Sequence, residues 1–227
     1  THCISSAASD VYKRQVLRIA TGRSLARTLV ADWIARLRHR APKVLVDGTQ
    51  LEISTGKMED MAMRLEQGKV DLLCCYEHPA LSMPLNPVRY RYMTLGTDKL
   101  VPVSQADGRG RARYTLGEGG QPVPLITYAG GLSMERILGD RLEATPYALA
   151  PFVRSDSLDA AHGAAAKGLG VAWLPWSMVA ADCRRGTLVS LGGRSDEIAF
   201  EVRLYRSRAR LADLAEAAWE ATANRKA

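Results

Sequence analysis

The sequence predicts an α/β protein whose parallel sheet is covered by helices. From Val16 onwards, short apolar or alternating segments take turns with longer segments whose apolar residues recur at helical spacing. This order of strand, helix and strand is typical of a parallel sheet, because parallel strands need a long connection that a helix commonly supplies. A second β/α unit, similar to the one that starts near Val16, starts near Leu100.

The first unit has five expected elements. They are the strand 17–20, a helix from Ser24 to just before Pro42, the strand 43–46, the helix 57–67 and the strand 70–76. Ser24 is a good N-cap, Pro42 cannot continue the first helix, and Gly68 is a typical stop for the second. The segment 78–87 contains three prolines and is expected to be a loop.

The second unit continues the alternation. Its expected elements are the strands 88–95 and 100–104, a surface excursion at 106–124, the strand 124–128, a helix from about Ser133, the strand 151–154, the helix 155–167, the strand 170–174, a helix after Pro175, an extended stretch at 188–191, the strand 198–205 and a final helix up to about Trp219. Residues 1–15 show neither periodicity nor a signal peptide, so we expect a leader outside the fold.

Composition excludes several classes of protein. The chain has 227 residues, 47% of them hydrophobic and 24% charged, and no apolar run approaches the roughly 18 residues of a membrane-spanning helix. The net charge of +7 suits an anionic partner, although two phenylalanines offer little stacking surface for single-stranded nucleic acid. The four cysteines form no CxxC pair, and Cys74 and Cys75 lie in an apolar strand, which favours a reduced cytoplasm over secretion.

No catalytic or nucleotide-binding motif is complete. Gly168-Leu169-Gly170 follows a helix and precedes a strand, the reverse of the order in a dinucleotide-binding fingerprint. The four histidines have no metal-ligand spacing, and no nucleophile–base pair is visible. We therefore expect no enzyme, no metal and no cofactor. The arginine-rich run 109–113 is expected to be a solvated loop.

Three strand-to-helix turns remain as candidate ligand sites, near 21–24, 127–133 and 155–157. Helix N-termini offer unpaired N–H groups and a positive dipole end, and ligands of α/β proteins bind at the carboxyl ends of strands. We expect a small anionic effector there. The expected effector-binding residues are Thr21, Arg23, Ser24, Thr127, Tyr128, Ser133, Arg154, Ser155 and Trp173.

Four segments together resemble the effector-binding domain of LysR-type transcriptional regulators: 17–37, 65–71, 98–103 and 167–175. A Gly-x-Gly element that leads into Ala172-Trp173-Leu174-Pro175, and the later run 185–189, are typical of that family. The resemblance covers nearly all of residues 16–219. It rests on the order and spacing of these segments rather than on one decisive motif.

The resemblance implies two Rossmann-like lobes joined by two crossover strands, as in type 2 periplasmic binding proteins. Lobe one would comprise 16–96 and 198–227, lobe two would comprise 97–197, and the effector would lie between them. Family members normally carry an N-terminal winged helix-turn-helix that reads the major groove. No stretch before Val16 holds its three helices, so we expect a fragment or a stand-alone sensor domain that by itself binds no specific DNA sequence.

Within the family, the segments 124–128 and 172–175 look most like those of the hypochlorite-responsive regulators, which use oxidisable methionines. Met134 matches one of those methionine positions, whereas Leu37 and Asp156 stand at the other two. Met134 is therefore the candidate redox-sensing residue, and a response to oxidative stress is a candidate role.

Our favoured hypothesis is the sensor half of a cytoplasmic transcription regulator. The alternative is a stand-alone solute-binding protein of the same architecture, although the absence of a signal peptide argues against its periplasmic form. The family dimerises through this domain, and the helix 26–37 has an apolar stripe wide enough to cover its own sheet and to reach a partner. We expect a two-fold homodimer with Leu29, Val30 and Trp33 near the shared surface, and no contact with a membrane.

Overall fold

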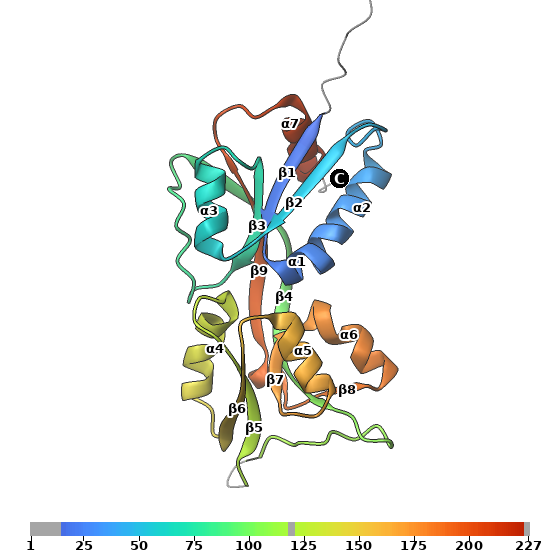
Figure 1. Cartoon of the computed structure of the whole chain (residues 1–227), viewed down its shortest axis with the longest axis vertical. Helices are drawn as coiled ribbons and strands as arrows, with labels where there is room; N and C mark the ends of the chain where they lie inside the picture. The colour runs from blue at the N-terminus through green and yellow to red at the C-terminus, as the bar shows by residue number, and fades with distance from the viewer. Residues whose placement is uncertain (1–14, 118–120, 225–227) are drawn as a thin grey trace, which may run out of the picture.

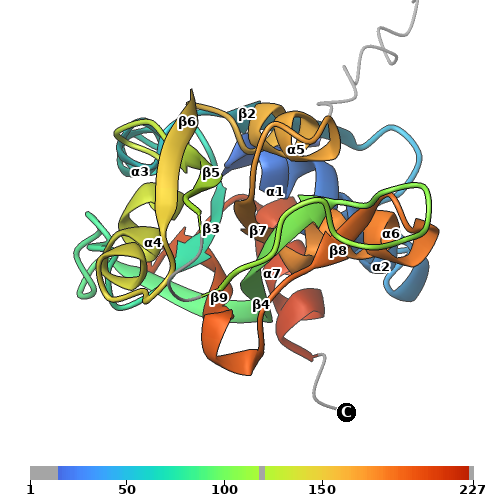
Figure 2. The same cartoon turned by 90° about the horizontal axis from the view of Figure 1, so that it is seen from below.

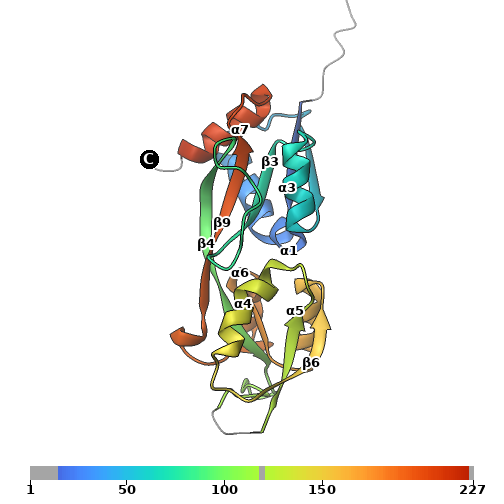
Figure 3. The same cartoon turned by 90° about the vertical axis from the view of Figure 1, so that its left-hand side faces the viewer.

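The computed structural model describes residues 15–117 and 121–224, so the expected leader lies outside the described residues apart from Gln15. Two lobes are stacked along the long axis of the molecule, with two long strands running between them (Figure 1). These crossover strands are β4 (Tyr90–Gln105) and β9 (Ile198–Ser207), which pair with each other antiparallel. Figure 3 shows them along one edge of both lobes. This is the α/β fold of two lobes and two crossover strands that the sequence predicted.

The first lobe is built on a parallel sheet with helices on both faces. Strand β1 (Val16–Thr21) lies between β2 (Gln50–Thr55) and β3 (Leu72–Glu77) and is parallel to both. Successive residues of a strand point to opposite faces, so Leu17 and Ile19 pack into one core while Ala20 packs into another. The helices of this lobe are α1 (Arg23–Leu25), a π-helical turn (Ala26–Val30), α2 (Ala31–Arg40), α3 (Met58–Glu66) and α7 (Asp213–Ala223).

The second lobe has strands β5 (Val123–Tyr128) and β6 (Leu149–Ser155), which are parallel to each other, and β7 (Ala172–Pro175) and β8 (Leu188–Ser190), which pair with β4. Its helices are α4 (Ser133–Glu143), α5 (Leu158–Ala166) and α6 (Trp176–Arg185). Seen from below, α4 and α6 lie on opposite sides of this lobe (Figure 2). The Gly-x-Gly element allows a close approach here, because a Cβ on Gly170 would lie 2.5 Å from the carbonyl oxygen of Pro124.

Two strand predictions are wrong in detail. Residues 43–46 form a turn rather than a strand, and their apolar Leu45 is buried against the core. The second strand is β2, an edge strand in which only Leu51 and Ser54 are partly covered, so its sequence pattern predicts a strand only weakly. The expected strands 88–95 and 100–104 form one continuous strand, β4, with a register irregularity between Thr94 and Gly96.

The crossover strand β9 is anchored to α7 by a buried ion pair. The guanidinium of Arg206 is 1% exposed and contacts both carboxylate oxygens of Glu216, at 2.5 and 2.6 Å. A bidentate pair of this kind fixes both distance and orientation, so the C-terminal helix is held on lobe one. No helix in the described part of the chain is long and apolar enough to cross a membrane.

Candidate functional site

A cavity of about 440 Å³ lies between the two lobes. This volume is in the range of about 300–1,000 Å³ that is usual for small-molecule sites. The first lobe contributes the turn after β1, the turn before α3 and the end of β3, and the second lobe contributes the turns before α4 and α5. Its lining residues are Gly22, Arg23, Ser24, Leu25, Gly56, Lys57, Met58, Asp60, Met61, Cys75, Tyr76, Gly130, Gly131, Leu132, Ser133, Met134, Asp156, Ser157, Leu158 and Asp159.

Four helix N-termini meet at this cavity. The first turns of α1, α3, α4 and α5 all contribute lining residues, because each helix follows a strand whose carboxyl end faces the space between the lobes. Three of these turns were predicted from the sequence, and the fourth, at 56–58, was not. The partial positive charge of a helix N-terminus favours an anionic group, so the cavity is predisposed to hold one.

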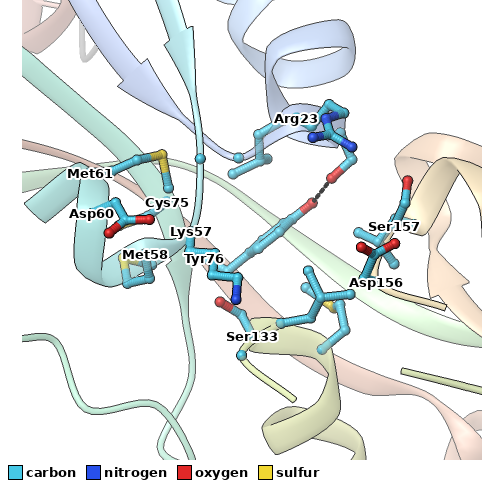
Figure 4. Close-up of a pocket in the computed structure, with 18 of the residues that line it drawn as sticks. Arg23, Lys57, Met58, Asp60, Met61, Cys75, Tyr76, Ser133, Asp156 and Ser157 are labelled. Carbon is cyan, nitrogen blue, oxygen red and sulfur yellow. Dashed lines mark hydrogen bonds between the residues drawn. The ribbon is translucent and has the colours of Figure 1, made fainter. Parts of the chain in front are cut away.

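Tyr76, at the end of β3, lies at the centre of the site (Figure 4). Its hydroxyl group is 3.0 Å from Ser24 Oγ, which joins β3 to the turn after β1. Its ring packs edge-on against Phe200 of β9, with ring centres 5.1 Å apart. Burial raises the pKa of the Tyr76 hydroxyl well above its usual range, so this group stays neutral and can both donate and accept a hydrogen bond.

Both lobes contribute apolar, sulfur-containing side chains to the cavity wall. Met61 and Cys75 from lobe one and Met134 from lobe two line it with buried side chains, and Met58 lies half-buried beside them. Burial raises the pKa of the Cys75 thiol well above its usual range, so this sulfur is a thiol rather than a reactive thiolate. Thioethers are flexible and polarisable, so this wall can adapt to an apolar group of varied shape.

Charged side chains of both signs line the remaining walls. Arg23 and Lys57 lie on lobe one, and within the described residues neither forms an ion pair or a side-chain hydrogen bond. In the part of the chain that the structure describes, the carboxylates of Asp60 and Asp156 also form no ion pair and no hydrogen bond. The third carboxylate, Asp159, lies 2.9 Å from Arg27 and is therefore neutralised.

Two ion pairs and one lysine connect the lobes around the cavity. Arg27 of lobe one pairs with Asp159 of α5, and Glu59 of α3 lies 3.8 Å from Arg136 of α4. Lys57 also reaches the second lobe, since a Cβ on Gly131 would lie 3.6 Å from its Nζ atom. Polar contacts at the rim of the cavity therefore join the two lobes.

The structure brings together four of the residues that the sequence singled out. Arg23, Ser24 and Ser133 line the cavity, and so does the candidate redox residue Met134, whose side chain is 1% exposed. Among them, Ser133 has no hydrogen-bond partner within the described part of the chain. These residues lie in the first turns of α1 and α4.

The other expected site residues do not line the cavity, and all of them except Thr21 have polar groups that are engaged elsewhere. Thr21 is fully buried next to Cys74, and Arg154 is exposed and 3.7 Å from Glu135. The side chains of the remaining four residues donate hydrogen bonds to backbone carbonyl oxygens: Thr127 to Val153 (3.2 Å), Tyr128 to Trp173 (2.5 Å), Ser155 to Ser157 (2.8 Å) and the Trp173 indole to Asp196 (2.9 Å).

Two of the three residues expected at a dimer surface are unavailable to a partner. Val30 is fully buried, and Trp33 is 2% exposed with its indole N–H donating to Thr222 Oγ1 at 3.0 Å. Both side chains fill the core of their own lobe, since the apolar stripe of this helix faces the sheet and α7. Leu29 alone of the three is partly exposed.

Sequence reasoning missed Lys57, Met58 and Tyr76. The misplaced second strand hid the turn before α3, so its residues were not recognised as following a strand. Tyr76 was assigned to a buried strand, although a polar side chain at the carboxyl end of a central strand is a signal for a site.

Comparison with known proteins identifies the family of this chain. The family model described as the LysR substrate binding domain matches residues 12–227. Two curated relatives each show 25% sequence identity over an alignment that covers 92% of this chain. They are the HTH-type transcriptional regulator YjiE of Escherichia coli strain K12 and the HTH domain-truncated transcriptional regulator QseD of E. coli O157:H7. The chain spans 64% of the length of the first and 81% of the second.

Solved structures show the same fold. The apo form of the regulatory domain of HypT from Salmonella typhimurium superposes on this chain with a TM-score of 0.78 and 23% sequence identity. The superposition covers 93% of this chain and 95% of the HypT domain. The Vibrio fischeri protein DarR, solved in complex with DNA, superposes with a TM-score of 0.78 and 24% sequence identity, over 92% of this chain and 68% of the DarR chain.

Proposed function

The chain belongs to the LysR substrate-binding domain family, and on this premise we propose that it senses a small anionic effector for a cytoplasmic, DNA-binding transcription regulator. The observation that carries this proposal is the convergence of four helix N-termini on one cavity between two lobes. Effector binding at contacts from both lobes would stabilise one lobe arrangement, and that shift would alter the DNA contacts made by another part of the regulator.

We assign the anionic group of the effector to Lys57 and Ser133, and Arg23 lies on the other side of Tyr76 from them (Figure 4). These side chains line the cavity without partners in the described structure, and N–H groups of the adjacent helix turns lie beside them. Charged hydrogen bonds of this kind contribute roughly 1.5–3 kcal/mol each. Loss of one should therefore weaken binding by at least about tenfold.

The test is a thermal-shift screen of small carboxylates, followed by calorimetry on the best ligand. Lys57→Met and Ser133→Ala should weaken its binding, whereas the control Thr127→Ala should not, because the Thr127 hydroxyl bonds to Val153 outside the cavity. Unchanged affinity in both cavity variants would reject the assignment.

Oxidation of Met134 is a second proposed signal at the same cavity. Oxygen transfer from hypochlorite to its thioether gives a sulfoxide and chloride, and the sulfoxide is polar. Because the Met134 side chain is buried in the cavity wall, a sulfoxide there would disturb both packing and effector binding. Mass spectrometry after hypochlorite treatment should find Met134 oxidised together with loss of effector binding, and Met134→Leu should retain binding after the same treatment.

A further inference from the structure

We propose that the effector is a zwitterion with an apolar body, of the class of an α-amino acid, and that Asp156 holds its cationic group. This inference rests on the proposed function, since it concerns the same cavity. It adds a positive group to the ligand and names the residue that recognises it.

Unpaired charges of both signs reach this cavity. The ion pairs Arg27–Asp159 and Glu59–Arg136 lie beside it. Arg23, Lys57 and Asp156 line the cavity with exposed side chains and pair with no charged group in the described part of the chain. Unpaired charges of both signs in one cavity fit a ligand that carries both signs.

A ligand of a single sign fits the cavity less well. A simple carboxylate would gain from Arg23, Lys57 and the helix N-termini, but it would also lie near the carboxylates of Asp60 and Asp156. A simple amine would be repelled by the same cations and helix ends. A zwitterion satisfies both sets of groups, because its carboxylate and its ammonium occupy different walls.

The two free carboxylates, Asp60 and Asp156, differ in their position relative to a helix. Asp60 lies in the first turn of α3, where the helix dipole already compensates a negative charge. Asp156 lies before the N-cap residue Ser157, outside α5, and its place in the site is across from Asp60 and on the other side of Tyr76 (Figure 4). Asp156 is therefore the free carboxylate that lies outside the first turn of a helix, and it is exposed at the cavity, where a cationic group of the ligand can reach it.

The body of the ligand would meet several apolar side chains. Among the buried lining residues, Ser24 and Tyr76 carry hydroxyl groups, and the others are aliphatic or sulfur-containing, namely Leu25, Met61, Cys75, Met134 and Leu158. An apolar side group of the ligand packs well on such a wall, and a long charged one does not. Leucine and methionine are the best first probes.

The experiment compares three probes of one shape by calorimetry: leucine, 4-methylpentanoate, which lacks the amino group, and 3-methylbutylamine, which lacks the carboxylate. Leucine should bind at least about tenfold more tightly than either analogue, because each charged contact contributes at least about that factor. Asp156→Asn should remove the advantage of leucine over 4-methylpentanoate. The matched control Asp60→Asn should keep that advantage.

The outcomes separate this inference from the proposed function. Binding of 4-methylpentanoate as tightly as leucine overturns the zwitterion but keeps an anionic effector in the cavity. An equal loss in Asp156→Asn and Asp60→Asn overturns the role of Asp156, since general electrostatics then explains the effect. Binding of neither leucine, methionine nor another apolar amino acid also overturns the inference, whereas the screen of carboxylates still decides the proposed function.

Discussion

Arg27 and Asp159 join the two lobes directly, with Arg27 Nη2 lying 2.9 Å from Asp159 Oδ1 beside the cavity. Arg27 belongs to the π-helical turn that follows α1, and Asp159 lies in the first turn of α5. The pair Glu59–Arg136 bridges α3 and α4 in the same way. One ion pair from each of the two helical segments of lobe one that border the cavity therefore bridges to lobe two.

The first prediction is that loss of both ion pairs lets the two lobes move apart. Arg27→Ala combined with Glu59→Ala should increase the radius of gyration measured by small-angle X-ray scattering, while each exposed pair contributes less than about 1 kcal/mol to stability. Arg210→Ala is the control, because it removes an exposed ion pair with Asp213 within a single lobe. A double variant whose scattering curve matches the wild type contradicts this role.

The second prediction concerns the buried pair of Arg206 and Glu216. Glu216→Gln leaves the buried guanidinium without its carboxylate, so urea unfolding should show a loss of about 3 kcal/mol in the free energy of unfolding. Asp213→Asn, which removes a fully exposed ion pair with Arg210, should cost less than about 1 kcal/mol. Equal effects of the two substitutions would show that burial of Arg206 does not matter.

The third prediction is the pH dependence of this pair. Hydrogen bonds from Arg206, and then from the Leu211 N–H, lower the pKa of Glu216 from 4.5 to about 2. A carboxyl group with a lowered pKa stabilises the fold above its unfolded pKa, and that contribution is lost as the pH falls towards the folded pKa. The stability difference between wild type and Glu216→Gln should therefore shrink between pH 4.5 and about 2 in urea titrations. A difference that stays constant across that window contradicts the coupling.

The fourth prediction concerns assembly. We expect a homodimer at tens of micromolar by sedimentation, and Leu29 is the member of the predicted surface that remains partly exposed. Leu29→Glu should shift the dimer towards monomer, whereas Val88→Glu, at a loop residue that is 79% exposed, should not. A clean monomer for the wild type rejects the dimer, and a dimer insensitive to Leu29→Glu places its surface elsewhere.

The sequence predicted most elements because their patterns were local. Helical spacing predicted α3 and α7, and the apolar run predicted β3, since each of these segments buries one face or both. Strand β2 was missed because an edge strand is exposed enough to be polar, while the apolar residues 44–45 merely cover the core from a turn. Local pattern does not distinguish these two cases.

The candidate site was predicted at the level of turns but not of side chains. The principle that helix N-termini gather at the carboxyl ends of strands correctly placed Ser24 and Ser133 at the cavity. The hydroxyl groups of Thr127 and Ser155 carry the same sequence signal, yet they bond to backbone carbonyls in their own lobe. Which hydroxyl faces the ligand depends on the register of strands far apart in sequence, which a single segment does not reveal.

The most direct test of the account is hydrogen exchange with the best ligand of the screen bound. We predict that the ligand protects backbone amides in the four turns around the cavity, at 22–25, 56–58, 130–134 and 156–159, because it contacts both lobes there. Protection confined to another depression, such as the groove of about 420 Å³ near Tyr92 and Arg208, would contradict an effector site between the lobes.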